Sequence, residues 1–165
     1  MELKFKVQTK IQKPVEEVFD AVHNPDKLSG YFTNGGSSAA LHEGTIVEWA
    51  FADNPGDEAF KIPVTVKKVV PNELIVLEWQ GARDHNTTVE MTFEKTGPDE
   101  TLVKISETGW RENQKDLDSS YGNCYGWSHM IFGLKAYTEY GINLRKGAFT
   151  GLYKMEDKKK SVEQQ

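Results

Sequence analysis

The sequence has little of what secretion, membrane insertion or nucleic-acid binding requires. It holds one cysteine, Cys124, so no disulfide can form within the chain, which is typical of proteins in reducing compartments. No apolar run approaches the roughly 18 residues that a membrane span needs, and the opening MELKFKVQTK lacks the apolar centre of a signal peptide. The net charge is −5, and the one dense basic cluster, residues 158–160, lies in a polar stretch. We therefore expect a cytoplasmic protein with no membrane span and no nucleic-acid partner.

Recognisable catalytic and metal-binding patterns are also missing. None of the histidines has another ligand at a metal-binding spacing; they are His23, His42, His85 and His129. No G-x-S-x-G motif occurs, and Gly35-Gly36 lacks the lysine of a phosphate loop. A catalytic cysteine needs a base within hydrogen-bond reach, and the sequence places none beside Cys124. We interpret this residue as a half-buried thiol. The sequence thus predicts no metal, no cofactor and no catalytic set, and leaves open whether the protein is an enzyme.

What the chain does contain is enough apolar material for one folded domain. Of its 165 residues, 38% are hydrophobic and 27% are charged, which is ordinary for a globular protein. Neither an internal repeat nor a linker divides it. We predict a single domain over residues 1–150 and a charged, flexible tail over residues 151–165.

Hydrophobic periodicity predicts the order of the elements. A period of two indicates strands, and apolar residues three or four apart indicate helices. The predicted strands are 3–11, 45–51, 60–67, 73–79, 89–94 and 103–109, and the predicted helices are 14–23, 25–32 and 117–144. Five successive strands joined by tight turns favour an antiparallel meander.

The last helix is the only element long enough to cover such a sheet. Its apolar stripe comprises Trp127, Met130, Ile131, Leu134, Tyr137 and Gly141. Glycine weakens a helix by roughly 1 kcal/mol relative to alanine. We therefore expect Gly122, Gly126, Gly133 and Gly141 either where backbones approach closely or where strain is tolerated for packing. The prediction is an α+β fold: a curved, six-stranded antiparallel sheet, two short helices, and a long C-terminal helix packed over the sheet.

This order of elements resembles the helix-grip fold of the START/Bet v 1-like (SRPBCC) superfamily. The closer resemblance is to the free-standing bacterial form of the domain named after the activator of Hsp90 ATPase. The stretches that carry it are IQKPVEEVFDAVHNPDKLSGYF (11–32), GTIVEWAF (44–51), ELIVLEW (73–79), VKISETGW (103–110) and GWSHMIFGLKAYTEYG (126–141). The resemblance implies a cavity between sheet and helix. It also suggests chaperone regulation and a stress response, although the separate N-terminal domain of the eukaryotic co-chaperone has no counterpart before the first strand.

Two placements are open for Glu107 at the end of the last strand. Alternation with Val103 and Ile105 puts its side chain on the inner face, where a carboxyl group would orient a ligand or act as an acid or base with a raised pKa. Charges are seldom buried without partners, however, which favours a carboxylate pointing to solvent at the mouth of the fold.

The apolar residues that should face the space between sheet and helix form the candidate ligand site. They are Phe32, Trp49, Phe51, Val64, Trp79, Met91, Phe93, Trp127, Met130, Ile131 and Leu134, with Glu107 beside them. They either fill the interior at crystal-like density or line a hydrophobic pocket, and the resemblance favours the pocket.

The sequence therefore supports a binding protein for a small hydrophobic, amphipathic or lipid-like molecule. The resemblance also offers a chaperone-interacting module, and, with less support, an enzyme of the polyketide cyclase kind that would use Glu107 as acid or base.

Overall fold

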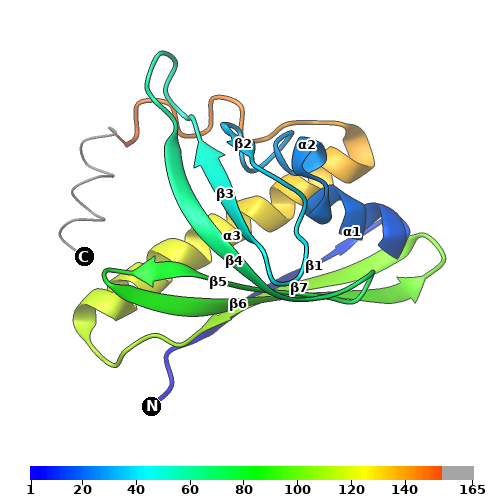
Figure 1. Cartoon of the computed structure of the whole chain (residues 1–165). Coiled ribbons are helices and arrows are strands. Elements are labelled where there is room, and N and C mark those ends of the chain that lie inside the picture. The colour runs from blue at the N-terminus through cyan, green and yellow to red at the C-terminus, as the bar shows by residue number, and fades with distance from the viewer. Residues whose placement is uncertain (154–165) are drawn as a thin grey trace.

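The computed structural model describes residues 1–153, and its elements follow the predicted order (Figure 1). Their bounds are β1 (Phe5–Ile11), α1 (Val15–His23), α2 (Pro25–Leu28), β2 (Gly36–Ser37), β3 (Ile46–Phe51), β4 (Phe60–Val70), β5 (Leu74–Ala82), β6 (His85–Gly97), β7 (Glu100–Thr108) and α3 (Gln114–Tyr140). Residues 154–165, most of the predicted tail, lie outside the described residues.

The strands form a single antiparallel sheet in the order β1-β7-β6-β5-β4-β3-β2. The predicted meander from β3 to β7 is confirmed, but the predicted count of six strands is wrong because the sheet has seven. The extra strand, β2, pairs Gly36 with Ala50 and Ser37 with Trp49. Two residues are too short to carry a period of two, so this strand leaves no hydrophobic pattern to read.

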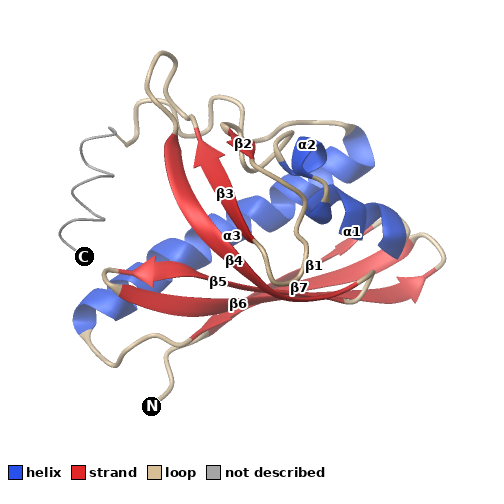
Figure 2. Cartoon of the chain, viewed as in Figure 1, coloured by secondary structure: helices blue, strands red, loops and turns tan. Residues whose placement is uncertain are grey.

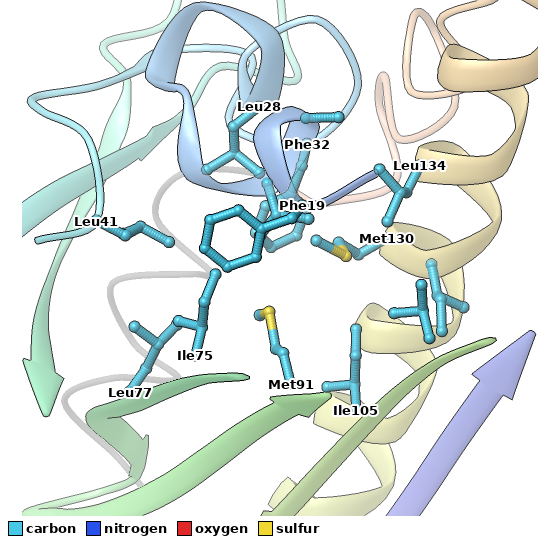
Figure 3. Packing of buried hydrophobic residues seen from close by; sticks show 14 of the residues in the cluster. Phe19, Leu28, Phe32, Leu41, Ile75, Leu77, Met91, Ile105, Met130 and Leu134 are labelled. Atoms are coloured by element: carbon cyan, nitrogen blue, oxygen red, sulfur yellow. The ribbon is translucent and has the colours of Figure 1, made fainter. Parts of the chain in front are cut away.

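The sheet curves around α3, and α1 and α2 lie together at one end of that helix (Figure 2). The strands alternate between buried residues and half-buried or exposed ones, which turns one face of the sheet inward. Figure 3 shows Met91 and Ile105 from the sheet pointing towards Met130 of α3 and Phe19 of α1. This packing confirms the predicted α+β architecture, with the core between the sheet and the helices.

The ends of α3 are fixed by capping. The side chain of Asn113 accepts a hydrogen bond from the backbone N–H of Asp116 at 2.9 Å, which starts the helix three residues before the predicted position. The helix ends at Tyr140 because Gly141 adopts a left-handed conformation with φ 67°. Of the predicted stripe, Trp127, Met130, Ile131 and Leu134 are buried and Tyr137 packs half-buried against the core. Gly141 does not belong to the stripe, because it is exposed and lies beyond the end of the helix.

The chain after α3 returns along the tip of the β3–β4 hairpin (Figure 1). Thr150 donates to the carbonyl of Asp53, and the backbone N–H of Gly151 donates to Asn54. None of the described helices has the length and apolar character needed to cross a membrane.

Candidate functional site

A cavity of about 670 Å³ opens between the sheet and the N-terminal half of α3. Aromatic side chains form much of its wall. The lining residues are Phe32, Phe51, Asp53, Phe60, Ile62, Trp79, Gln80, Gly81, Lys115, Asp118, Ser119, Gly122, Asn123, Tyr125, Gly126, Trp127, Arg145, Phe149 and Tyr153. Gln80 on the sheet side and Gly122 and Gly126 on the helix side are exposed, so the cavity reaches solvent.

The predicted ligand residues divide between this cavity and the core. Four of them line the cavity: Phe32, Phe51, Trp79 and Trp127. Six belong to the packed core instead: Trp49, Val64, Met91, Phe93, Ile131 and Leu134. Met130 borders a second pocket of about 300 Å³ beneath the segment that follows α3. Both readings of the apolar set are thus realised, each in a different part of the interior.

The aromatic wall is built from side chains in mutual contact. The ring of Trp127 lies 5.3 Å from Trp79 and is stacked at 5.6 Å on Phe32. Phe32 makes an edge-to-face contact with Phe51 at 5.2 Å, and Trp49 packs behind the group at 6.1 Å from Trp79. Such contacts prefer defined orientations, which gives the wall a fixed shape.

Behind this wall lies Glu107, whose side chain is completely buried. Its Oε1 accepts hydrogen bonds from Trp79 Nε1 at 2.9 Å and from Thr87 Oγ1 at 2.6 Å. Its Oε2 accepts from Trp127 Nε1 at 3.0 Å. The amide of Asn123 donates to both oxygens, at 3.1 and 3.2 Å. Because Trp79, Trp127 and Asn123 also line the cavity, the carboxyl group sits one side-chain layer behind it.

The inward placement of Glu107 is therefore correct, and the solvent-facing placement that the rarity of buried charges favoured is wrong. The hydrogen-bond donors that stabilise the buried carboxyl group come from β5, β6 and α3. The alternation of residues within β7 gives no information about these donors. Burial raises the pKa of Glu107, while the hydrogen bonds from Thr87, Trp79, Asn123 and Trp127 oppose that rise. The indole N–H groups and the NH2 group of Asn123 can only donate, so these contacts favour the ionised carboxylate.

Gly81 makes the approach of these groups possible. A Cβ atom built at this position would lie 2.1 Å from Thr87 Oγ1 and 2.8 Å from Glu107 Oε1. The pairing of β5 with β6 shifts register between Trp79 and Ala82, and such irregularities often redirect side chains beside a site. Only glycine fits where the strand passes the carboxylate.

Arg145 closes one end of the cavity. Its guanidinium makes two hydrogen bonds of 3.0 Å to the two carboxylate oxygens of Asp53. It also lies 4.9 Å from the centre of the Phe51 ring and 4.8 Å from that of Phe149. The segment after α3 is thereby held against the β3–β4 hairpin and contributes to the cavity wall.

Of the three glycines within α3, one lies where a close backbone approach was expected and two do not. Gly133 does lie close to another backbone, because an added Cβ would be 3.4 Å from the carbonyl oxygen of Tyr31. At Gly122 and Gly126, by contrast, an added Cβ would meet no atom within 4 Å. These two glycines leave space in the cavity wall. The presence of several glycines on one helix was therefore the sequence feature that indicated a cavity beside it.

Several lining residues had no sequence signal. Asn123 sits four residues before Trp127 on one helix face, but its pairing with Glu107 depends on the tertiary fold. Asp53 and Arg145 are 92 positions apart. Within residues 1–153, no group of three or more histidine, cysteine or acidic side chains is arranged to hold a metal ion.

Comparison with known proteins places this architecture in a family. The family model described as "Activator of Hsp90 ATPase homolog 1-like protein" matches residues 12–139. None of the curated proteins compared with the chain matches it.

Solved structures show the same fold at low sequence identity. The protein SSP2350 from Staphylococcus saprophyticus is 24% identical with a TM-score of 0.70, over 87% of this chain and 96% of that one. The Aha1 dimer from Colwellia psychrerythraea is 20% identical with a TM-score of 0.66, over 84% and 98%. The AHSA1-like protein from Aeromonas hydrophila is 18% identical with a TM-score of 0.68, over 84% and 94%. The likeness to these structures is one of fold, and with the family match over most of its length the chain belongs to the Activator of Hsp90 ATPase homolog 1-like family.

Proposed function

We propose that this chain binds a small hydrophobic or amphipathic molecule in the cavity between the sheet and α3. The observation that carries the proposal is the cavity of about 670 Å³ with a preformed aromatic wall. Ligand sites typically have volumes of about 300–1,000 Å³, with mostly apolar walls and a few polar groups. Gln80, Ser119 and Asn123 supply such polar groups here.

The position of Glu107 supports binding over acid–base catalysis. A general acid or base must come within about 3 Å of the proton that it transfers. Trp79, Trp127 and Asn123 stand between this carboxyl group and the cavity, and each donates a hydrogen bond to it. A cyclase-like reaction would require another acid or base, and we therefore favour a binding protein.

The family match favours a second candidate, a chaperone-interacting module, because the family is named for an activator of Hsp90 ATPase. The solved Aha1 dimer adds support through its fold alone. An affinity pull-down on the full chain, followed by an ATPase assay with the recovered chaperone, tests this candidate. Recovery of no chaperone above the level of a control resin would contradict it.

Titration with the neutral fluorophore N-phenyl-1-naphthylamine tests ligand binding directly. We expect saturable enhancement of its emission at micromolar concentrations. Gly126→Trp should abolish it, because the new ring enters a space where a Cβ meets no atom within 4 Å.

Gly126→Ala is the matched control for that variant. Like the tryptophan variant it raises helix propensity over glycine, by about 1 kcal/mol for alanine and by less for tryptophan, but it fills almost none of the cavity. The control should bind the fluorophore as the parent does. Unchanged binding by Gly126→Trp, or no binding by the parent chain, would contradict the proposed site.

A further inference from the structure

Glu107 is a buried negative charge with neutral partners. Its five hydrogen bonds come from two indoles, one hydroxyl and one amide. In the part of the chain that the structure describes, none of the ion pairs includes it. A buried charge is screened much less by salt than a surface charge. Its field therefore extends into the adjoining cavity.

The remaining charges of the cavity wall balance one another. Asp53 is paired with Arg145 through two hydrogen bonds. Lys115 and Asp118 lie one helical turn apart at the exposed start of α3 and contribute one charge of each sign. Among the described residues that line the cavity, these four charges cancel in pairs, which leaves Glu107 directly behind the wall as the charge without a counterpart.

The aromatic rings between Glu107 and the cavity transmit that charge. Trp79 and Trp127 each direct the N–H edge of the indole at the carboxylate and border the cavity with another part of the ring. Donation of a hydrogen bond to an anion increases the electron density of the donor ring. Electron-rich indole is the aromatic group that attracts cations most strongly.

The same wall already holds one cation at its far end. The guanidinium of Arg145 lies 4.9 Å from the ring of Phe51 and 4.8 Å from that of Phe149. Both rings line the cavity. Contacts between a cation and an aromatic ring are thus part of how this cavity is built, and Trp79, Trp127 and Phe32 make none with a side chain among the described residues.

We propose that the cavity selects an organic cation, such as a quaternary or heavily alkylated ammonium group on an apolar body. This inference rests on the proposed function and specifies its ligand class. A primary ammonium suits the site poorly, because the oxygens of Glu107 are already occupied and lie behind the rings. Its three N–H groups would lose water, and the wall offers only a few polar side chains, such as Gln80 and Ser119, to replace it. An alkylated ammonium has few or no N–H groups to satisfy and is attracted by the rings and by the charge behind them.

A pair of isosteres tests the charge alone. Benzyltrimethylammonium and neopentylbenzene have nearly the same shape. The first has a positively charged nitrogen at the branch point, and the second has a neutral carbon there. Each is titrated against the full chain loaded with N-phenyl-1-naphthylamine, and displacement is measured. We expect the cation to bind at least about tenfold more tightly than its neutral isostere. If the two compounds bind equally, or if neopentylbenzene binds more tightly, the inference is overturned while the proposal of ligand binding stands. Failure of the fluorophore itself to bind overturns both.

Glu107→Gln identifies the source of the preference. It keeps the length of the side chain and one acceptor oxygen and removes the charge, so the preference for the cation should fall to about twofold or less. Glu90→Gln is the matched control, because Glu90 is an exposed glutamate of the neighbouring strand β6, and its removal changes the net charge equally. Equal loss in both variants, or no loss in Glu107→Gln, contradicts the assignment to Glu107. The isostere comparison on the parent chain needs no variant and decides the matter if Glu107→Gln fails to fold.

Discussion

Trp127 belongs at once to the core, the cavity wall and the shell of the buried carboxylate, and substitutions separate these roles. Its side chain is 2% exposed, its ring contacts Phe32 and Trp79, and its N–H donates to Glu107 at 3.0 Å. Truncating a buried aromatic side chain to alanine lowers the free energy of unfolding by about 3–5 kcal/mol. We expect Trp127→Ala to fall in that range.

Trp127→Phe keeps an aromatic ring and deletes the N–H. A hydrogen bond to a charged group contributes about 1.5–3 kcal/mol, so we expect a loss of about 2 kcal/mol. In the Glu107→Gln background the acceptor is neutral, and the same change should cost about 1 kcal/mol. The difference is the coupling energy of a double-mutant cycle.

Urea unfolding followed by far-UV circular dichroism measures all four proteins of this cycle without relying on tryptophan emission. A loss under about 1 kcal/mol for Trp127→Ala would refute the placement of this ring in the core. A coupling energy of zero between Trp127→Phe and Glu107→Gln would refute a hydrogen bond from Trp127 to an ionised Glu107.

Three further changes test the surroundings of the site. Burial raises the folded-state pKa of Glu107, so its stabilising contribution is full below the unfolded pKa of about 4.3 and is lost as pH rises through the folded pKa. The stability of the parent relative to Glu107→Gln, from urea midpoints, should therefore fall with rising pH, and a rise would contradict this. Gly81→Ala should lower the free energy of unfolding by about 1–3 kcal/mol because its Cβ overlaps Thr87; an unchanged urea midpoint would contradict the close approach. Arg145→Met leaves the buried Asp53 carboxylate without its guanidinium, which costs about 3 kcal/mol or more, so amide exchange after α3 should accelerate about 100-fold; unchanged exchange would show that the pair does not hold the segment.

The fold was predictable where burial leaves a period in the sequence. The alternation of Val103, Ile105 and Glu107 gave the inner face of β7, and the spacing of Trp127, Met130 and Leu134 gave that of α3. Periodicity did not give the correct strand ends at the tight turn between β5 and β6. The predicted strands 73–79 and 89–94 left residues 80–88 between them, yet β5 and β6 extend to Ala82 and from His85 and are joined by a turn of two residues in which Asp84 has φ 51°. Side chains typical of loops here flank a tight hairpin.

The candidate site was predictable only in part, because its decisive contacts join distant segments. Alternation indicates the direction of Glu107 but not its burial, which depends on donors from β5, β6 and α3. The pairing of Asp53 with Arg145 leaves no local pattern in either stretch. The division of the apolar residues into core and cavity wall likewise depends on how far α3 stands from each strand.

Glu107 fulfils two roles that have different physical requirements. As an acceptor it orients the indoles of Trp79 and Trp127 and so fixes the shape of the wall, which any well-placed acceptor would do. As a charge it sets the potential inside the cavity, which a neutral acceptor cannot do. A buried charge without a cation partner lowers stability relative to an apolar substitute, so orientation alone does not explain why an ionisable side chain stands here. An alkylated cation in the cavity would supply the missing partner, and ligand binding would then offset a cost that the unliganded fold carries.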